Sequence, residues 1–231
     1  MPDNFIFDKA GPISTITFNR PERRNCLNEE VIFEFEDLLH RVRDDRETRA
    51  LIVTGTGNSF CAGADLSMFK GAADPQQRRE ASRKVSKRLP RLIGRAFDVI
   101  AHMDAVTIGA LNGYAIGGGW SIALAFDFCL AVEAAEFWVP EVDMAVPYRG
   151  GPAQIIGARL GPWRAKEAIL LCRHYTAAEL LALGVINRIV KPEALMPEAR
   201  ELANTLVAKS PDAIAGSKRD INAIFYGERL Y

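Results

Sequence analysis

The feature that most constrains the fold is the segment of residues 105–126, which contains no charged side chain. A run of this length could cross a membrane as a helix. It contains, however, Asn112-Gly113 and the triplet Gly117-Gly118-Gly119, which are turn signals rather than helix interior. The pattern therefore predicts a buried strand, a glycine turn and a buried helix, and it argues against a membrane span.

Strand-like and helix-like segments alternate along the rest of the chain. Ile13–Phe18, residues 49–54 and Val106–Leu111 are rich in β-branched and apolar residues, as strands are. Asn28 is a good N-cap, and apolar residues follow it at helical spacing. After Pro152 the pattern is almost wholly helical, apart from residues 185–190. This alternation predicts an α/β fold with a helical C-terminal region.

Composition narrows the possible functions. The 29 basic residues balance the 29 acidic ones, which excludes a generally basic nucleic-acid-binding protein. The four cysteines are far apart, with no Cys-x-x-Cys pair, so we expect reduced thiols and no metal site. The first eleven residues have neither the basic region nor the long apolar region of a signal peptide, so we expect a cytoplasmic location.

Residues 78–95 are locally basic. The stretch contains many basic residues and a single acidic one, Glu80. The apolar face of the same predicted helix carries Val85, Leu89, Leu92 and Ala96. Two interpretations are open, a solvated helix face or a surface for a phosphate-bearing ligand. Nucleic acid is a weaker alternative, because no aromatic residues interleave the charges.

Two glycine-rich segments can present backbone N–H groups to a ligand. Residues 59–66 and residues 112–120 each place small residues before a predicted helix. The first N–H groups of a helix have no acceptor within the helix, so they can face an anion. Donors from both segments could converge on one oxygen and form an oxyanion hole. By contrast, Gly55-Thr56-Gly57 lacks the later glycine of a dinucleotide-binding fingerprint and is interpreted as a plain turn.

The ordered motifs resemble those of the crotonase superfamily, the enoyl-CoA hydratase/isomerase family. The resemblance runs through residues 19–28 (NRPERRNCLN), 60–66 (FCAGADL), 112–119 (NGYAIGGG), 137–142 (FWVPEV) and 177–190. It implies a spiral of repeated β-β-α turns over residues 1–190. It further implies a helical oligomerisation region over residues 191–231, which would form a homotrimer or a dimer of trimers.

The resemblance also implies a site for an acyl-CoA thioester, with coenzyme A as part of the substrate and no other cofactor. It maps the two oxyanion-hole donors to the backbone N–H groups of Ala64 and Gly118. The residues expected to bind coenzyme A or the substrate are Arg23, Arg24, Ala62, Asp65, Leu66, Gly117 and Tyr148.

The catalytic side chains depart from the family's two-glutamate pattern. Glu141 follows Pro140, where the family carries one glutamate, and it is the expected base. The other position is Ser121, which can hold water or a substrate hydroxyl by hydrogen bonds. One carboxylate suits double-bond isomerisation. The serine–glutamate pair also resembles the hydroxycinnamoyl-CoA hydratase-lyase branch.

Other interpretations of these residues stay open. Tyr148, in the turn of residues 147–152, could contact the acyl group or only cap the pocket; a tyrosine there resembles the decarboxylase branch. With one family glutamate missing, the chain could be a non-catalytic acyl-CoA-binding protein. Ser121, followed by Asp143 and His174, also has the residue order of a serine thioesterase.

Overall fold

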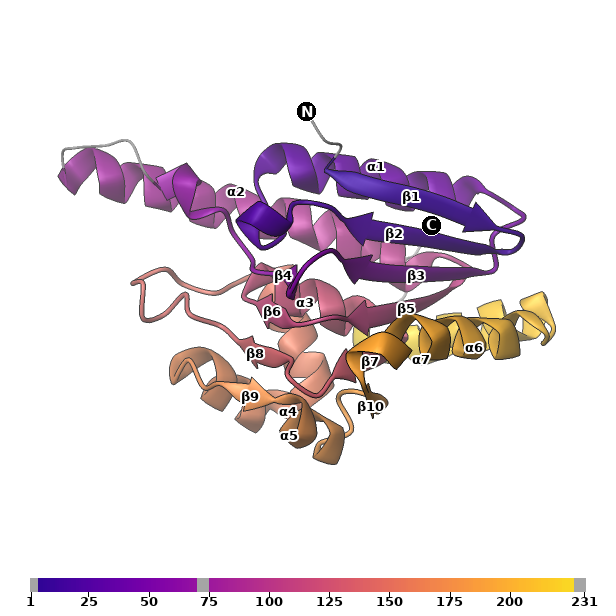
Figure 1. Cartoon of the computed structure of the whole chain (residues 1–231). Helices are drawn as coiled ribbons and strands as arrows, with labels where there is room; N and C mark the ends of the chain where they lie inside the picture. Colours follow the sequence, from indigo (N-terminus) through magenta and orange to yellow (C-terminus); the bar gives the residue numbers. More distant parts are fainter. Residues whose placement is uncertain (1–3, 70–74, 227–231) are drawn as a thin grey trace.

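The computed structural model describes the backbone of residues 4–69 and 75–226, and their side chains except at residues 69, 75–86 and 225–226. Six strands form one sheet in the order β1-β2-β3-β5-β7-β10, and four form a second in the order β4-β6-β8-β9. Figure 1 shows the strands descending through the molecule, from β1 at the top to β9 and β10 at the bottom. The strands are β1 Phe5–Ala10, β2 Ile13–Phe18, β3 Ala50–Gly55, β4 Ser59–Cys61, β5 Val106–Leu111, β6 Tyr114–Ile116, β7 Phe128–Val132, β8 Glu136–Trp138, β9 Tyr175–Thr176 and β10 Arg188–Val190.

Helices connect and cover these strands. The α-helices are α1 Glu29–Asp44, α2 Pro75–His102, α3 Gly118–Ala125, α4 Gly151–Leu170, α5 Ala177–Ala182, α6 Leu195–Val207 and α7 Pro211–Tyr226. The pairs β2·β3, β3·β5, β5·β7 and β7·β10 are parallel, whereas β1 runs antiparallel to β2. Every residue of β5 is buried, as expected for a central parallel strand with both faces covered. The predicted α/β class is confirmed.

Helix α1 forms as the sequence predicts. The Asn28 side chain accepts a hydrogen bond from the N–H of Val31 at 2.8 Å, which caps the helix. The buried face carries Phe35, whose ring lies 5.7 Å from that of Phe5 and 5.1 Å from that of Phe18. These aromatic contacts fix α1 on β1 and β2.

The uncharged segment of residues 105–126 folds as β5, a turn, β6 and α3, so its interpretation as strand, turn and helix is confirmed. All residues of α3 are buried. A Cβ on Gly119 would lie 2.8 Å from the carbonyl carbon of Cys61, so only glycine lets α3 approach the end of β4 this closely. In the described part of the chain, no helix is both long and apolar enough to span a membrane.

Some elements differ from the sequence prediction. Strands β1, β6 and β9 were not predicted: four of the six residues of β1 are exposed, β6 has three residues within the predicted glycine turn, and β9 has only two. Strand β10 begins at Arg188 rather than at residue 185. The helix expected near Asp65 is a four-residue 3-10 helix, Leu66–Phe69.

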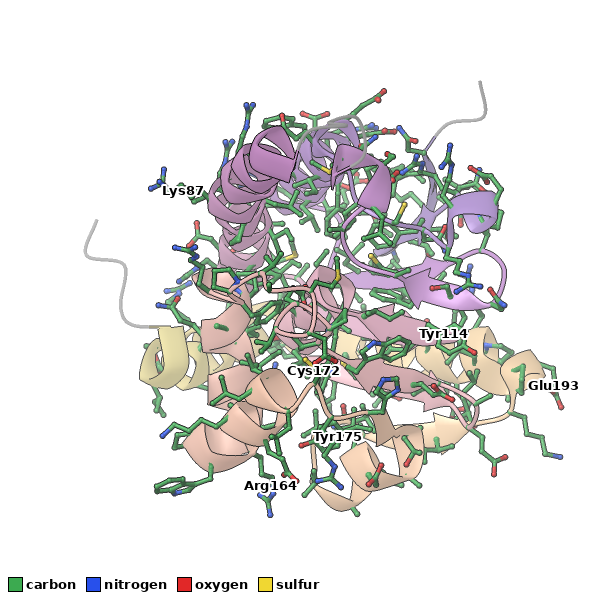
Figure 2. All side chains as sticks on the ribbon, turned by 90° about the vertical axis from the view of Figure 1, so that its left-hand side faces the viewer. Lys87, Tyr114, Arg164, Cys172, Tyr175 and Glu193 are labelled. Carbon is green, nitrogen blue, oxygen red and sulfur yellow. The ribbon has the colours of Figure 1, made fainter. Side chains whose placement is uncertain are left out.

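The basic stretch lies on α2, which extends away from the sheets in Figure 1. Lys87 and Arg88 are exposed, and Figure 2 shows Lys87 pointing outward. Arg88 pairs with Glu29 at 3.0 Å, and Arg95 pairs with Glu36 at 2.7 Å. The predicted apolar face is buried at Leu89, Leu92 and Ala96. The side chains of Arg78, Arg79, Glu80, Arg83, Lys84 and Val85 lie outside the described residues.

The C-terminal region is helical, as predicted. Helix α6 packs on β3, β5 and β7, and α7 packs on α2. Lys218 of α7 donates to the carbonyl oxygens of Ile100 and Ala105 and pairs with Asp127 at 2.8 Å. The division at residue 190 and the role of this region in oligomerisation stay predictions.

Candidate active site

The two glycine-rich segments meet where β4 ends and α3 begins. Gly63 adopts a φ of +78°, which favours glycine. A Cβ there would lie 2.5 Å from the carbonyl oxygen of Ile116 and 3.5 Å from the nitrogen of Gly118. The absence of a side chain at Gly63 therefore lets the backbone of residues 63–64 lie against the first turn of α3.

This contact places two backbone N–H groups beside one cavity. In the parallel bridge between Leu27 and Ala64, Leu27 donates to Gly63 at 2.7 Å and accepts from Asp65 at 2.8 Å. The bridge thus leaves the N–H of Ala64 on the opposite side. Gly118 is the first residue of α3, so its N–H has no acceptor within the helix. Both residues line the same cavity, which is the arrangement an oxyanion hole requires.

Apolar side chains make up most of the cavity wall, with few polar groups among them. Glu141, Tyr148 and Arg149 supply the polar side chains, beside the backbone of Ala64 and Gly118. The remaining lining residues are Leu89, Pro90, Ile93, Val146, Pro147 and Pro152. A mainly apolar pocket with a few convergent polar groups is typical of a small-molecule site.

Glu141 is the carboxylate of this cavity. Burial raises its pKa to about 7, because the apolar surroundings disfavour the charged form. Its Oε2 atom has no hydrogen-bond partner among the residues that the structure describes. A Cβ on Gly117 would lie 3.2 Å from the carboxyl carbon of Glu141, so glycine is needed for this approach. A carboxyl with these properties can exchange a proton near neutral pH.

Ser121 is fully buried in α3, and its hydroxyl contacts other protein groups. It forms a hydrogen bond with the Tyr148 hydroxyl, and it lies 3.1 Å from the carbonyl oxygen of Pro152. Tyr148 in turn donates to the carbonyl oxygen of Gly117 at 2.9 Å. Burial raises the pKa of Tyr148 well above its usual range, and the nearby Glu141 adds to this. Tyr148 lines the cavity, whereas Ser121 lies behind it.

Five of the residues expected to bind coenzyme A or the substrate lie on two neighbouring segments and do not line the cavity, namely Arg23, Arg24, Ala62, Asp65 and Leu66. The N–H of Ala62 donates to the carbonyl oxygen of Arg24 at 3.0 Å, so the loop that carries Arg23 and Arg24 lies against residues 62–65. Arg23 and Arg24 are exposed, as is Leu66. Asp65 is buried, and its carboxylate lies 3.8 Å from the guanidinium of Arg20.

The structure does not assemble the residues of a serine thioesterase. The Ser121 hydroxyl contacts Tyr148 and Pro152 rather than a histidine. The ring of His174 stacks on Trp138 at 4.3 Å. Without a base in contact with the serine, the nucleophile would not be activated.

Several lining residues were not singled out from the sequence as site residues. Leu89, Pro90 and Ile93 come from α2, and Val146 comes from the loop after Glu141. Periodicity indicates that Leu89 is buried, but a pattern within one helix does not show which cavity its side chains line. Arg149 is adjacent to Tyr148 in the same turn. This adjacency is the one local signal in the sequence that Arg149 belongs to the site.

Comparisons with known proteins agree with this fold. A family model described as enoyl-CoA hydratase/isomerase matches residues 8–229. A short-chain-enoyl-CoA hydratase of Clostridium acetobutylicum is 33% identical over 221 residues, which are 95% of this chain and 81% of the relative. A carnitinyl-CoA dehydratase of Citrobacter koseri is 34% identical over 219 residues, which are 94% of this chain and 80% of the relative.

Solved structures show the same likeness. An enoyl-CoA hydratase of Bacillus anthracis superposes with a TM-score of 0.83 at 29% identity, covering 95% of this chain and 82% of that one. An enoyl-CoA hydratase/isomerase family protein of Hyphomonas neptunium gives a TM-score of 0.87 at 28% identity, covering 100% of this chain and 86% of that one.

The chain therefore belongs to the enoyl-CoA hydratase/isomerase family. It is an enzyme of that family, and the predicted crotonase fold is confirmed.

Proposed function

We propose that this enzyme acts on an acyl-CoA thioester through an enolate and uses Glu141 as its one catalytic carboxylate. The observation that carries the proposal is the position of Glu141 in the same cavity as Ala64 and Gly118. A thioester carbonyl that accepts hydrogen bonds from these two N–H groups would lie beside the Glu141 carboxylate. Donors aimed at a developing enolate oxygen stabilise the transition state.

The proposed reaction is the isomerisation of a 3-enoyl thioester to a 2-enoyl thioester. Ionised Glu141 removes a proton from the carbon beside the carbonyl, and the electron pair moves onto the oxygen held by Ala64 and Gly118. The resulting dienolate then takes the proton back from Glu141 at the fourth carbon. No atom is gained or lost, and one carboxyl both removes and returns the proton.

The surroundings of Ser121 favour isomerisation over hydration by two carboxylates. Its hydroxyl is buried against Tyr148 and Pro152, behind the cavity that holds Glu141. A serine in this position does not supply the second acid–base group that activates water in such a hydration. Isomerisation needs no such group.

Hydration of a 2-enoyl thioester, or hydration with cleavage as in hydratase-lyases, is the second candidate. The names of two relatives, a short-chain-enoyl-CoA hydratase and a carnitinyl-CoA dehydratase, favour it. In this reaction Glu141 would have to act on both water and substrate. Offering 2-enoyl-CoA and 3-enoyl-CoA thioesters separately, and identifying the products by mass spectrometry, distinguishes the two candidates.

The experiment that tests enolate formation is deuterium uptake by a panel of acyl-CoA thioesters in heavy water, measured for the wild type and for Glu141→Gln. We expect uptake beside the carbonyl, and a loss in the variant at least as large as that from removing one hole donor, roughly 10²–10³-fold. No uptake from a thioester that demonstrably binds would instead indicate a non-catalytic acyl-CoA-binding protein. Sensitivity to a serine-directed phosphonate would indicate a thioesterase.

The remaining parts of the proposal concern partners and location. Coenzyme A enters as part of the substrate, with its phosphates near Arg23 and Arg24, and no other cofactor takes part. We propose assembly as a homotrimer or a dimer of trimers in the cytoplasm. Light scattering of the purified protein tests the assembly.

A further inference from the structure

The Gly117–Gly118 peptide carries the second proposed hole donor, and its carbonyl group on the other side is held by one backbone and one side-chain hydrogen bond. A trans peptide unit is planar, so its C=O and N–H groups point in opposite directions. Fixing the direction of the Gly117 carbonyl therefore also fixes the direction of the Gly118 N–H. The carbonyl accepts two hydrogen bonds, from the N–H of Ser121 at 3.1 Å and from the Tyr148 hydroxyl at 2.9 Å.

The two hydroxyl groups have two protons for three contacts, and we adopt the assignment that keeps the hydrogen bond to Gly117. Tyr148 has one proton and donates it to Gly117. Ser121 is then the donor in its contact with Tyr148, and it shares this proton with the carbonyl oxygen of Pro152. Ser121 thus has no proton left to give to a substrate. Its effect on the site passes through Tyr148.

This chain also strengthens the donor at Gly118. Hydrogen bonds in series polarise one another, and this effect is larger in a buried site than in water. Ser121 polarises the Tyr148 hydroxyl, which polarises the Gly117 carbonyl. The amide resonance carries this polarisation to the N–H of Gly118.

We propose that Ser121 and Tyr148 are positioning residues that orient and polarise the Gly118 N–H. Neither exchanges a proton with the substrate. Ser121 occupies the position where two-glutamate members of the family carry a carboxylate, and here it supports the oxyanion hole instead. This inference rests on the proposed function, because it assigns a role within the same oxyanion hole.

The test compares Tyr148→Phe, Ser121→Ala and the double variant with the wild type. Tyr175→Phe is the matched control, because Tyr175 (labelled in Figure 2) is also buried, lies on β9 and does not line the cavity. Two readouts are needed. The first is kcat and KM for deuterium exchange, and the second is the ¹³C chemical shift of the thioester carbonyl in bound, carbonyl-labelled butyryl-CoA. The second reports the strength of the hole donors without any turnover.

We expect Tyr148→Phe to lower kcat about tenfold, less than the 10²–10³-fold cost of removing a hole donor outright. KM should stay within about twofold, and the carbonyl shift should move toward that of free butyryl-CoA. Ser121→Ala should act in the same direction. The double variant should be no slower than Tyr148→Phe alone, because both residues belong to one chain. Tyr175→Phe should change neither readout.

Three results would overturn the inference. One is an unchanged kcat and carbonyl shift in Tyr148→Phe, which would leave the hydroxyl a purely structural role. Another is additive losses in the double variant. The third is a Ser121→Ala variant that is slower than Tyr148→Phe while its carbonyl shift stays that of the wild type, because Ser121 would then act on the substrate itself. If Ser121→Ala does not fold, the carbonyl shift measured in Tyr148→Phe alone tests the inference.

A failure of the proposed function gives a different pattern. A wild type that binds butyryl-CoA but exchanges no deuterium would contradict enolate chemistry. The carbonyl shifts of the wild type and Tyr148→Phe would still show whether the two residues support the hole.

Discussion

Gly117→Ala tests whether the active site depends on the close approach of Glu141 to the start of α3. Gly117 has a φ of +52° and a ψ of −120°, a combination that L residues rarely adopt. An added Cβ would lie 3.2 Å and 3.3 Å from the carboxyl carbon and Oε2 of Glu141, and closer still to Oε1. An ordinary contact would need the carboxylate to move by about 1 Å, and a misplacement of that size costs on the order of 100-fold in rate.

The backbone adds a separate cost in stability. Holding an alanine in this conformation costs about 1–3 kcal/mol, so the free energy of unfolding should fall by that amount. We expect the variant to fold, to melt at a lower temperature, and to exchange deuterium into an acyl-CoA thioester about 100-fold more slowly. Thermal unfolding by circular dichroism and exchange measured by mass spectrometry give the two values on one preparation.

Gly157→Ala is the matched control. Gly157 lies within α4, and a Cβ there would meet nothing within 4 Å. Alanine is favoured over glycine in a helix by about 1 kcal/mol, so this variant should be at least as stable as the wild type and fully active. A Gly117→Ala variant that keeps kcat within about twofold of the wild type would refute the placement of Glu141 as the base.

Three further predictions concern the pH dependence and the stability of the fold. Because the Glu141 pKa is raised to about 7 and the base is its ionised form, kcat/KM should fall about tenfold per pH unit below 7 and level off above it; a flat profile from pH 5 to 8 would contradict this. Asn28→Ala should lower the free energy of unfolding by about 1 kcal/mol in urea titrations through loss of the helix cap. Lys218→Met should cost about 3 kcal/mol, because it leaves the largely buried Asp127 without its cation, whereas Arg219→Met, at an exposed pair, should change little.

Much of the fold could be predicted because its signals are local. Asn28 caps α1 and the apolar spacing after it defines the buried face, so both follow from neighbouring residues. The uncharged segment with its glycines likewise predicts β5, a turn and α3. Strand β1 was not predicted, because it lies at the edge of the sheet, where a strand needs few apolar residues.

The sequence by itself determined the family and the candidate residues. The glycine-rich segments are recognisable because backbone conformation and close approach demand small residues there, and the resemblance to the family points to the glutamate after Pro140. These motifs do not show how the side chains meet. Ser121 and Tyr148 are 27 positions apart, and no local pattern predicts the hydrogen bond between them.

Only the tertiary structure decided what surrounds each candidate. It placed Glu141 in an apolar cavity that raises its pKa, and it turned Ser121 away from that cavity toward Tyr148 and Pro152. The physical reason is that desolvation and hydrogen bonding depend on groups brought together from different elements. The cavity around Glu141 is lined by the segment after β4, by α2 and α3, and by the loop before α4 with the first turn of α4, and only the packing of these elements creates it.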